Sequence, residues 1–375
     1  MNFLVLDSAR PQVLGGIERA LADLAARART AGHDARAAGR RGSRFAAHCR
    51  SLGVPTLELP LRNAFDLPSL VRLRRLFREH RTVAVLGATT RDGRLAGLAR
   101  LGSRRPRVVL LVGLPMMRDS LFHRVTYRHL VDALLTPTEW QRAQVHRYSF
   151  ARRLPCLVAP DGVDESRFPP LAELAAARRT ARAELGVPAR RTVYLSAGHL
   201  VVRKNLEFLP PLLARLPRGA EWEWWIAGDG PREAALRAAA EEHRLSGRVR
   251  FLGAREDVPR LLLCADAVVM PSRAEQLPLV ALEALRAGVP RVLVSAVGAV
   301  DEMRALGIET LPRDDPAAWL AALVGAGRDP GGCRAPQAWD RGAEAAAARR
   351  LEALALLAAP DPAGAGRPDR PEVRR

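Results

Sequence analysis

Glu275 and Glu283 lie eight positions apart, on either side of the expected start of a helix that follows the apolar run 267–270. The first turn of a helix presents unpaired N–H groups and a partial positive charge, so it attracts phosphate. Pro278 suits the first helical position, which leaves the amides of Leu277 and Leu279 free to face an anion. Carboxylates instead accept paired hydrogen bonds from vicinal hydroxyls. These residues therefore predict a ligand that carries both phosphate and diol groups, as a nucleotide sugar does.

Lys204 is the only lysine in a chain of 375 residues that holds 59 basic residues, all the others being arginine. The lysine ammonium is a compact point charge and the arginine guanidinium is a planar fork, so the two are not interchangeable. Lys204 can be a chance survivor of an arginine-rich composition. Its place in the loop after an expected strand favours the alternative, a site where a small cation is needed.

The length and composition indicate a globular protein of two domains, each large enough for its own core. No apolar run approaches the ~18 residues of a membrane span, and the N-terminal segment does not have the pattern of a signal peptide. Four cysteines, at positions 49, 156, 264 and 333, lie far apart without paired spacing. Such cysteines are typical of reduced core thiols in a cytoplasmic protein and do not predict a zinc site.

The formal net charge of +19 is concentrated in one half of the chain. Residues 1–160 hold 28 arginines and 11 acidic residues, a balance of +17, and the remainder is close to neutral. Unless this reflects compositional drift alone, it predicts an anionic partner for the first half. Few aromatic residues are interleaved with the arginines, so nucleic acid is not expected, whereas an anionic membrane surface fits. A basic helix with Arg72, Arg74, Arg75 and Arg78 is either a solvated face or a lipid-docking surface.

Strands and helices are expected to alternate along the whole chain, which predicts parallel sheets covered on both faces. The expected strands lie at 2–7, 54–59, 83–86, 108–112, 133–136, 157–159, 192–197, 222–226, 249–252 and 267–270. The expected helices include 17–31, 66–80, 171–185 and a segment from about Lys204, which Pro210 and Pro211 must kink or delay. The fold class is therefore α/β, with two doubly wound Rossmann-like domains facing each other across a cleft.

The expected boundaries follow from the same pattern. Residues 1–160 are expected to form one Rossmann-like domain, and residues 161–335 are expected to form the other. A helix at 336–359 could cross back to the first domain, and the Pro/Gly/Arg-rich residues 360–375 are expected to be disordered.

Several short motifs occur in a fixed order. They are Gly15-Gly16-Ile17-Glu18-Arg19, Ala159-Pro160-Asp161-Gly162-Val163-Asp164 with Arg167-Phe168, Ala197-Gly198-His199-Leu200 with Arg203-Lys204-Asn205, Ile226-Ala227-Gly228-Asp229-Gly230-Pro231, Val249–Gly253, and Glu275-x7-Glu283 followed by Ala284-x-x-Ala287-Gly288-x-Pro290. This ordered set resembles the family 4 retaining glycosyltransferases of GT-B architecture. The resemblance covers most of the chain and is most specific over residues 192–302. It implies that the domain of residues 1–160 lies on the acceptor side and that the domain of residues 161–335 binds the nucleotide sugar.

The resemblance implies a role for each matching residue. Lys204 and Arg203 would neutralise the departing diphosphate, Glu275 would hold hydroxyls of the transferred sugar, and Glu283 would hold the donor ribose. The remaining donor-binding residues would be Gly16, Gly198, His199, Gly253, Arg255, Leu277 and Leu279. Neither metal nor cofactor is implied, because fixed cations and a helix dipole take its place. The acceptor would be a carbohydrate or a lipid-linked glycan, and the enzyme could lie on the inner membrane face.

The sequence departs from the family pattern at three places. His199 stands where many members have arginine, and Gln276-Leu277-Pro278 replaces the commoner Gly-Phe-Gly. The first domain usually offers a histidine after the strand 108–112, where this chain has Gly113-Leu114-Pro115-Met116. Arg118, Asp119 and His123 are the remaining candidates on the acceptor side.

Two other classes of protein remain alternatives. A nucleotide-sugar 2-epimerase has the same architecture but needs acid/base carboxylates and histidines in the cleft, where histidine is scarce here. A non-catalytic basic protein would bind DNA or RNA with strong salt dependence and ignore nucleotide sugars.

Overall fold

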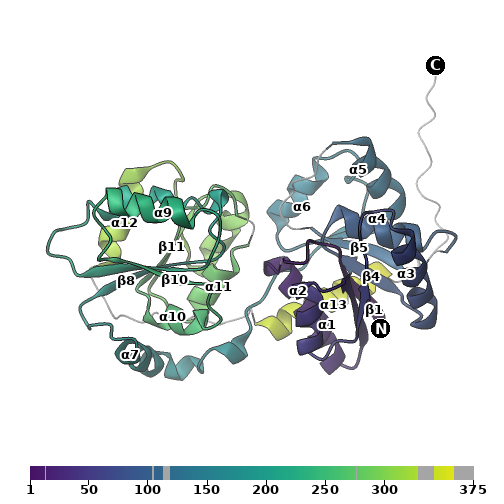
Figure 1. Cartoon of the computed structure of the whole chain (residues 1–375), viewed down its shortest axis with the longest axis horizontal. Coiled ribbons are helices and arrows are strands. Elements are labelled where there is room, and N and C mark those ends of the chain that lie inside the picture. The colour runs from purple at the N-terminus through teal and green to yellow at the C-terminus, as the bar shows by residue number, and fades with distance from the viewer. Residues whose placement is uncertain (13, 104, 113–118, 276, 328–341, 359–375) are drawn as a thin grey trace, which may run out of the picture.

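The computed structural model describes residues 1–12, 14–103, 105–112, 119–275, 277–327 and 342–358. The chain forms two α/β domains, each built on one twisted parallel sheet (Figure 1). The expected fold class is therefore confirmed. Cys333 and Arg118 lie outside the described residues. Within the described residues, no helix combines the length and apolarity needed to cross a membrane.

The first domain alternates strands and helices from the N-terminus. Its elements are β1 (Asn2–Asp7), α1 (Gly16–Thr30), β2 (Asp34–Arg40), α2 (Arg44–Ser51), β3 (Thr56–Leu59), α3 (Leu67–Glu79), β4 (Ala84–Gly87), α4 (Thr90–Ala99), β5 (Arg107–Leu111), α5 (Leu121–Val125), the π-helical turn η1 (Thr126–Leu130), β6 (Ala133–Thr136), α6 (Glu139–His146) and β7 (Cys156–Val158). The strand order is β3-β2-β1-β4-β5-β6-β7, with parallel pairing throughout. Helices α1 and α2 cover one face of this sheet, and α3, α4, η1 and α6 cover the other.

The second domain repeats this plan. Its elements are the 3-10 turns η2 (Glu165–Arg167) and η3 (Leu171–Glu173), α7 (Leu174–Glu184), β8 (Thr192–Ala197), the 3-10 turns η4 (Val202–Lys204) and η5 (Leu206–Phe208), α8 (Pro210–Leu213), β9 (Trp222–Ala227), α9 (Glu233–Glu242), β10 (Val249–Gly253), α10 (Val258–Cys264), β11 (Ala267–Met270), α11 (Leu279–Arg286), β12 (Arg291–Ser295), η6 (Gly298–Leu306), β13 (Glu309–Leu311) and α12 (Pro316–Ala326). The strand order is β10-β9-β8-β11-β12-β13.

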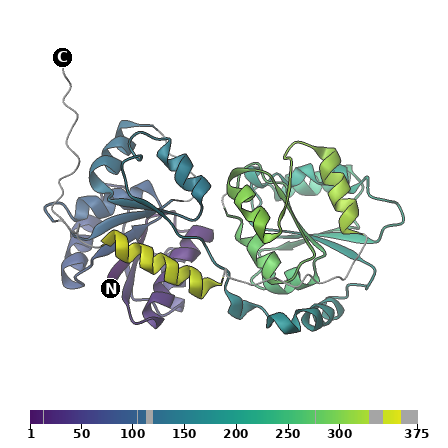
Figure 2. The same ribbon diagram turned by 180° about the vertical axis from the view of Figure 1, so that it is seen from behind.

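The last helix, α13 (Ala343–Ala358), packs on the first domain, although it follows the second in the chain (Figure 2). Leu351 and Leu354 join the core beneath α1. Arg350 of α13 pairs with Asp161 of the interdomain segment, and Arg27 of α1 pairs with Asp164 at 3.1 Å. The connection between the domains is therefore tied to the first domain from two sides.

The structure corrects several expectations about single elements. The helix expected from Lys204 is replaced by η4, η5 and the short α8, because Pro210 and Pro211 fit only the first positions of a helix. Pro278 is the N-cap of α11 and not its first helical residue. Strand β2 and helices α2 and α4 were not expected from the sequence. The sequence of β2, DARAAGR, has no long apolar side chain, so its burial between β1 and β3 decides its conformation.

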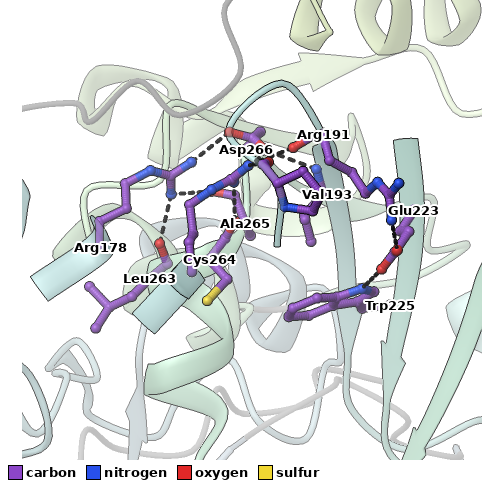
Figure 3. A network of polar contacts seen from close by, with 11 residues as sticks. Arg178, Arg191, Val193, Glu223, Trp225, Leu263, Cys264, Ala265 and Asp266 are labelled. Atoms are coloured by element: carbon purple, nitrogen blue, oxygen red, sulfur yellow. Dashed lines mark hydrogen bonds and ion pairs between the residues drawn. The ribbon is translucent and has the colours of Figure 1, made fainter. Parts of the chain in front are cut away.

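A buried ion cluster joins α7 to the edge of the second sheet where its strands begin (Figure 3). Asp266 accepts hydrogen bonds from Arg178 at 2.5 Å, from Arg182 at 3.0 Å and from the Val193 amide at 2.7 Å. Both guanidinium groups also donate to backbone carbonyls, including that of Cys264. The charges of this cluster are thus fully hydrogen-bonded, which is the condition for burying them.

The three tryptophans of β9 are core residues. Trp222, Trp224 and Trp225 are all buried. The Trp224 indole donates to Ser196 at 3.1 Å and the Trp225 indole to Glu223 at 2.7 Å, so both of these N–H groups have a partner.

Candidate functional site

The strand order of each sheet reverses direction at one point, which is where ligands bind in doubly wound folds. In the second domain the reversal lies between β8 and β11, and a pocket opens there beyond the ends of both strands. Its lining residues are Ser196, Ala197, Gly198, His199, Lys204, Leu206, Val269, Met270 and Ser272. Three of the predicted donor-site residues, Gly198, His199 and Lys204, therefore face one pocket.

Glycines shape the backbone beside this pocket. Three of them have positive φ values that residues with a side chain rarely adopt: 133° at Gly198, 149° at Gly228 and 153° at Gly230. A Cβ on Gly228 would lie 1.9 Å from the Gly198 carbonyl oxygen, and one on Gly230 would lie 2.4 Å from the Leu200 carbonyl oxygen. The two loops are also joined by a hydrogen bond of 2.7 Å from the Leu200 amide to the Asp229 carbonyl. The loop after β9 therefore buttresses the loop after β8.

Replacing Gly228 with alanine is expected to destabilise the second domain by at least about 2 kcal/mol, since backbone atoms must shift to admit the methyl group. Chemical denaturation measures this change. Gly219→Ala is the matched control, because no atom lies within 4 Å of the Cβ it would introduce. Equal stability of the two variants would contradict this account of the loop.

Lys204, Arg203 and Glu275, the three residues predicted to act on the departing diphosphate and the sugar, lie in contact beside the pocket, which Lys204 itself lines. The Lys204 ammonium donates to Glu275 Oε1 at 2.6 Å, and Arg203 Nη1 lies 3.6 Å from Glu275 Oε2. The Ser272 hydroxyl also donates to Glu275 Oε1, at 2.7 Å. Glu275 is only 5% exposed, whereas the Arg203 side chain is about half exposed. A bound anion could thus replace Glu275 as the partner of both cations. The Glu275 carboxylate would then be free to accept hydrogen bonds from hydroxyl groups of the ligand.

The short turn that carries Lys204 is held from both sides. Asn205 adopts a left-handed conformation with φ 53°, and its side-chain amide donates to the Pro271 carbonyl at 3.1 Å. The Arg273 amide donates to the Arg203 carbonyl at 2.8 Å. The loops after β8 and β11 therefore fix the position of the Lys204 backbone.

Glu283 lies on α11, on the side of the first domain. Its carboxylate is 3.3 Å from Arg167, and burial raises its pKa while Arg167 and Arg19 oppose that shift. A Cβ on Gly16 would lie 3.8 Å from a methyl group of Leu279, so the glycine turn of the first domain approaches the start of α11. Leu277 and Leu279 are half-buried against the core. The structure thus brings Gly16, Leu279 and Glu283 to one interdomain region.

Three more predicted donor-binding residues lie at the end of a strand of the second sheet or in the loop that follows one: His199, Gly253 and Arg255. His199 Nδ1 is 2.7 Å from the Asp229 carbonyl oxygen, so the ring is held against the neighbouring loop. The Gly253 carbonyl accepts from the Gly228 amide at 2.7 Å, and Gly253 has φ 67°. Arg255 forms a two-pronged pair with Asp257 at 2.7 and 2.6 Å on the surface. To contact a nucleotide base, Arg255 would have to leave this partner.

The acceptor-side candidates lie apart from this cluster. Asp119 binds Arg124 at 2.7 and 2.9 Å on the surface, and this pair lowers the pKa of the carboxyl. His123 lies on α5, and its Nδ1 is 2.8 Å from the Ser120 hydroxyl, which caps that helix. Both side chains thus contact neighbours on their own segment.

Sequence reasoning missed an acidic pair at the reversal point of the first sheet, between β1 and β4. Asp92, at the start of α4, accepts from the amide and hydroxyl of Ser8 and from the amides of Ala88 and Thr89. Asp7, at the end of β1, is 1% exposed, and its Oδ2 has no hydrogen-bond partner among the described residues. The Thr-x-x-Asp capping pattern at 89–92 could have identified Asp92, but no local pattern marks its contact with Ser8.

Asp7 is expected to make stability fall as pH rises. Burial, followed by the charge of Asp92, raises its pKa to about 7 from an ordinary value of 3.8. The folded state therefore binds the proton more tightly, and this stabilisation is present at low pH and lost as pH rises through 7. Between pH 5 and pH 7 the loss is about 2 kcal/mol. Asp7→Asn should flatten the dependence in urea unfolding at several pH values; an unchanged dependence would show that another group is responsible.

Comparisons with known proteins agree with this geometry. The family model described as Glycosyltransferase Family 4 matches residues 14–167, and the model described as Glycosyl transferases group 1 matches residues 177–311. Together the two models span most of the chain, one on each domain. The chain belongs to the family 4 glycosyltransferases of GT-B fold, as the ordered motifs indicated.

Curated relatives match over part of their length. The lipopolysaccharide core biosynthesis glycosyltransferase LpsE of Rhizobium meliloti is 38% identical over 117 residues, which are 31% of this chain and 34% of LpsE. The D-inositol 3-phosphate glycosyltransferase of Corynebacterium urealyticum is 33% identical over 223 residues, 55% of this chain and 51% of that protein. The chain thus matches about a third to a half of these relatives.

Solved structures match over nearly the whole fold. Anabaena HepE in complex with UDP and glucose aligns with a TM-score of 0.75 at 18% identity, covering 94% of this chain and 98% of HepE. A glycosyltransferase from Rickettsia africae aligns with a TM-score of 0.77 at 13% identity, covering 95% of this chain and 98% of that protein. At these identities the likeness establishes the two-domain fold.

Proposed function

We propose that the chain is a metal-independent retaining glycosyltransferase that moves a hexose from a nucleotide-sugar donor to a glycan or lipid-linked acceptor. The observation that carries this proposal is the cluster of Lys204, Arg203 and Glu275 at the reversal point of the second sheet. Two cations and a carboxylate on glycine-shaped loops suit a ligand with a diphosphate next to hydroxyl groups. The complex of HepE with UDP and glucose supports a donor in which the sugar is linked to a nucleoside diphosphate.

In this reaction the bond between the sugar and the diphosphate breaks, and negative charge grows on the diphosphate. Lys204 and Arg203 would stabilise that charge, together with the amides at the start of α11. Glu275, released from Lys204, would hold sugar hydroxyls, and Glu283 would hold the ribose. The acceptor would attack from the face that the diphosphate leaves, and a donor phosphate oxygen would take its proton. No protein base is required by this route, which fits a first domain whose described acceptor-side residues are paired with neighbours.

The names of two relatives support an acceptor at the cell envelope. LpsE acts in lipopolysaccharide core biosynthesis, and WaaB, a structural neighbour, is an outer core galactosyltransferase. We extend this chemistry to the present chain as assembly of a surface polysaccharide or glycolipid on the cytoplasmic side of a membrane.

Two readouts test the proposal. Release of nucleoside diphosphate from a donor panel, with EDTA present, tests transfer without a metal. NMR of the product tests the anomeric configuration, which retention leaves as in the donor. Release that requires added divalent metal, or an inverted product, would overturn the mechanism, and a 2-epimerised nucleotide sugar would indicate an epimerase.

Glu283→Gln is expected to raise the donor KM about tenfold and to change kcat less, because the ribose contact is made before and during the transition state. Steady-state kinetics measure both constants. Glu242→Gln, on the exposed end of α9, is the control and should behave as wild type. A wild-type donor KM in Glu283→Gln would remove Glu283 from the donor site.

A further inference from the structure

Large apolar side chains lie exposed on two helices of the first domain. Leu67 and Val71 of α3 are 68% and 59% exposed, and Leu121 and Phe122 of α5 are 74% and 63% exposed. Phe65, just before α3, and Val125 of α5 are exposed as well. We call these six residues the outer apolar face. Most surface apolar residues need no explanation, but six on two segments of one domain are a candidate interaction site.

The two helices begin at the same edge of the sheet. Helix α3 follows β3 and α5 follows β5, and all strands of this sheet are parallel. Each helix therefore starts where the strands end, on the edge that also carries the Gly15-Gly16 turn. Helix α4 lies between them and contacts both α3 and η1. The guanidinium of Arg94 on α4 lies 5.7 Å from the centre of the Phe122 ring, so a basic residue of α4 lies beside the apolar segment on α5.

On each of the two segments, exposed arginines follow the apolar residues along the chain. On α3, Leu67, Val71, Arg75 and Arg78 follow one another at helical spacing, opposite the buried Leu73 and Phe77. On the second segment, Leu121 and Val125 are followed by the exposed Arg128. Each segment thus carries its apolar side chains near the edge of the sheet where the strands end, and its cations farther from that edge. The Arg74 guanidinium is not available to this face, because it donates to the carbonyls of Ala99 and Leu101. Arg75 is exposed and pairs with Glu79 on the same helix at 2.6 Å, a surface pair that a lipid phosphate can replace.

This order of side chains matches the layers of an anionic bilayer. Apolar groups enter the boundary between headgroups and acyl chains, while cations remain at the phosphates. The excess of +17 in residues 1–160 attracts such a surface over a distance of about a Debye length. We propose that the outer apolar face, with Arg75, Arg78 and Arg128, docks the first domain onto a membrane rich in anionic lipid.

The docking surface bears on the proposed function but does not depend on it. It lies on the edge of the first sheet where an acceptor would enter, so a lipid-linked acceptor could reach the site without leaving the bilayer. Vesicle binding needs neither donor nor acceptor. Donor binding, measured on the same preparation without vesicles, therefore fails or succeeds independently.

The test is sedimentation of the full chain with vesicles of phosphatidylcholine, alone or with 30% phosphatidylglycerol. The wild type should pellet with the anionic vesicles and be released by salt. The triple change Arg75→Gln, Arg78→Gln and Arg128→Gln should lower the partition coefficient roughly 100-fold, at about fivefold per charge. The double change Leu67→Ser and Phe122→Ser should lower it at least about tenfold, because two inserted side chains are lost. All five side chains are exposed, so the melting temperature should be unchanged.

Matched variants in the second domain provide the controls. Arg179→Gln, Arg215→Gln and Arg218→Gln remove the same charge from exposed positions, and Leu171→Ser removes an exposed leucine. These variants should pellet like the wild type. Wild-type protein that stays in solution, or controls that lose binding equally, would overturn the proposal. So would light scattering that finds a dimer in the wild type and a monomer in Leu67→Ser with Phe122→Ser, because the face would then bind a second copy.

Discussion

Lys204→Ala is expected to lower kcat by a factor on the order of 10² to 10³, with a smaller effect on the donor KM. Removing one fixed donor from an oxyanion site has an effect of this size, because charge on the leaving group grows in the transition state. Lys204 is positioned for this role by its contact with Glu275 and by the backbone contacts around Asn205. Turnover under saturating donor measures the effect.

The controls for Lys204 separate catalysis from folding. Lys204→Arg keeps the charge but not its compact shape, so it should recover only part of the activity. The unfolding midpoint of each variant shows whether loss of the Glu275 partner has disturbed the fold. Full turnover by folded Lys204→Ala would contradict the role assigned to the single lysine.

Asp266→Ala is expected to destabilise the second domain by about 3–5 kcal/mol. Removing the carboxylate leaves Arg178 and Arg182 buried without their counter-ion, and breaking a buried pair has a cost of this size. Asp266→Asn keeps the shape and some hydrogen bonds, so it should fold and lose less. Equilibrium unfolding in urea measures both.

The matched control for Asp266 is Asp314→Ala, which breaks an exposed pair with Arg313. Exposed pairs contribute 0–1 kcal/mol, so this variant should be nearly as stable as the wild type. If Asp266→Ala and Asp314→Ala lost the same small amount, the cluster in Figure 3 would not hold α7 to the sheet.

Local patterns in the sequence were sufficient to predict the fold and part of the site. The regular alternation of apolar strands and helices predicted two parallel sheets. The glycines around 198 and 228, together with Lys204 and Glu275, predicted loops that the structure brings to one pocket. Each of these signals lies within about ten residues, where strand ends and turns follow from residue type.

Contacts between distant segments could not be read in the same way. Ser8 and Asp92 are 84 positions apart, and nothing in either segment indicates the other. Arg178 and Asp266 are 88 positions apart, and an arginine-rich helix gave no sign of which guanidinium is buried. Arg255 matched a motif position, but its nearest acid, Asp257, engages it in the structure. Strand β2 was missed because alanine has no preference for strands, and neighbouring strands decide its conformation.

Thermal unfolding with a panel of UDP-, GDP-, ADP- and dTDP-sugars tests the central claim most directly. At a hundred times its dissociation constant, the correct donor should stabilise the folded chain by about 2.7 kcal/mol. We expect one nucleotide class to raise the unfolding temperature in the wild type and to do so far less in Glu283→Gln. If no donor shifts the wild type, the chain does not bind a nucleotide sugar at the pocket of Lys204 and Glu275, and if Glu283→Gln responds fully, Glu283 is not part of the donor site.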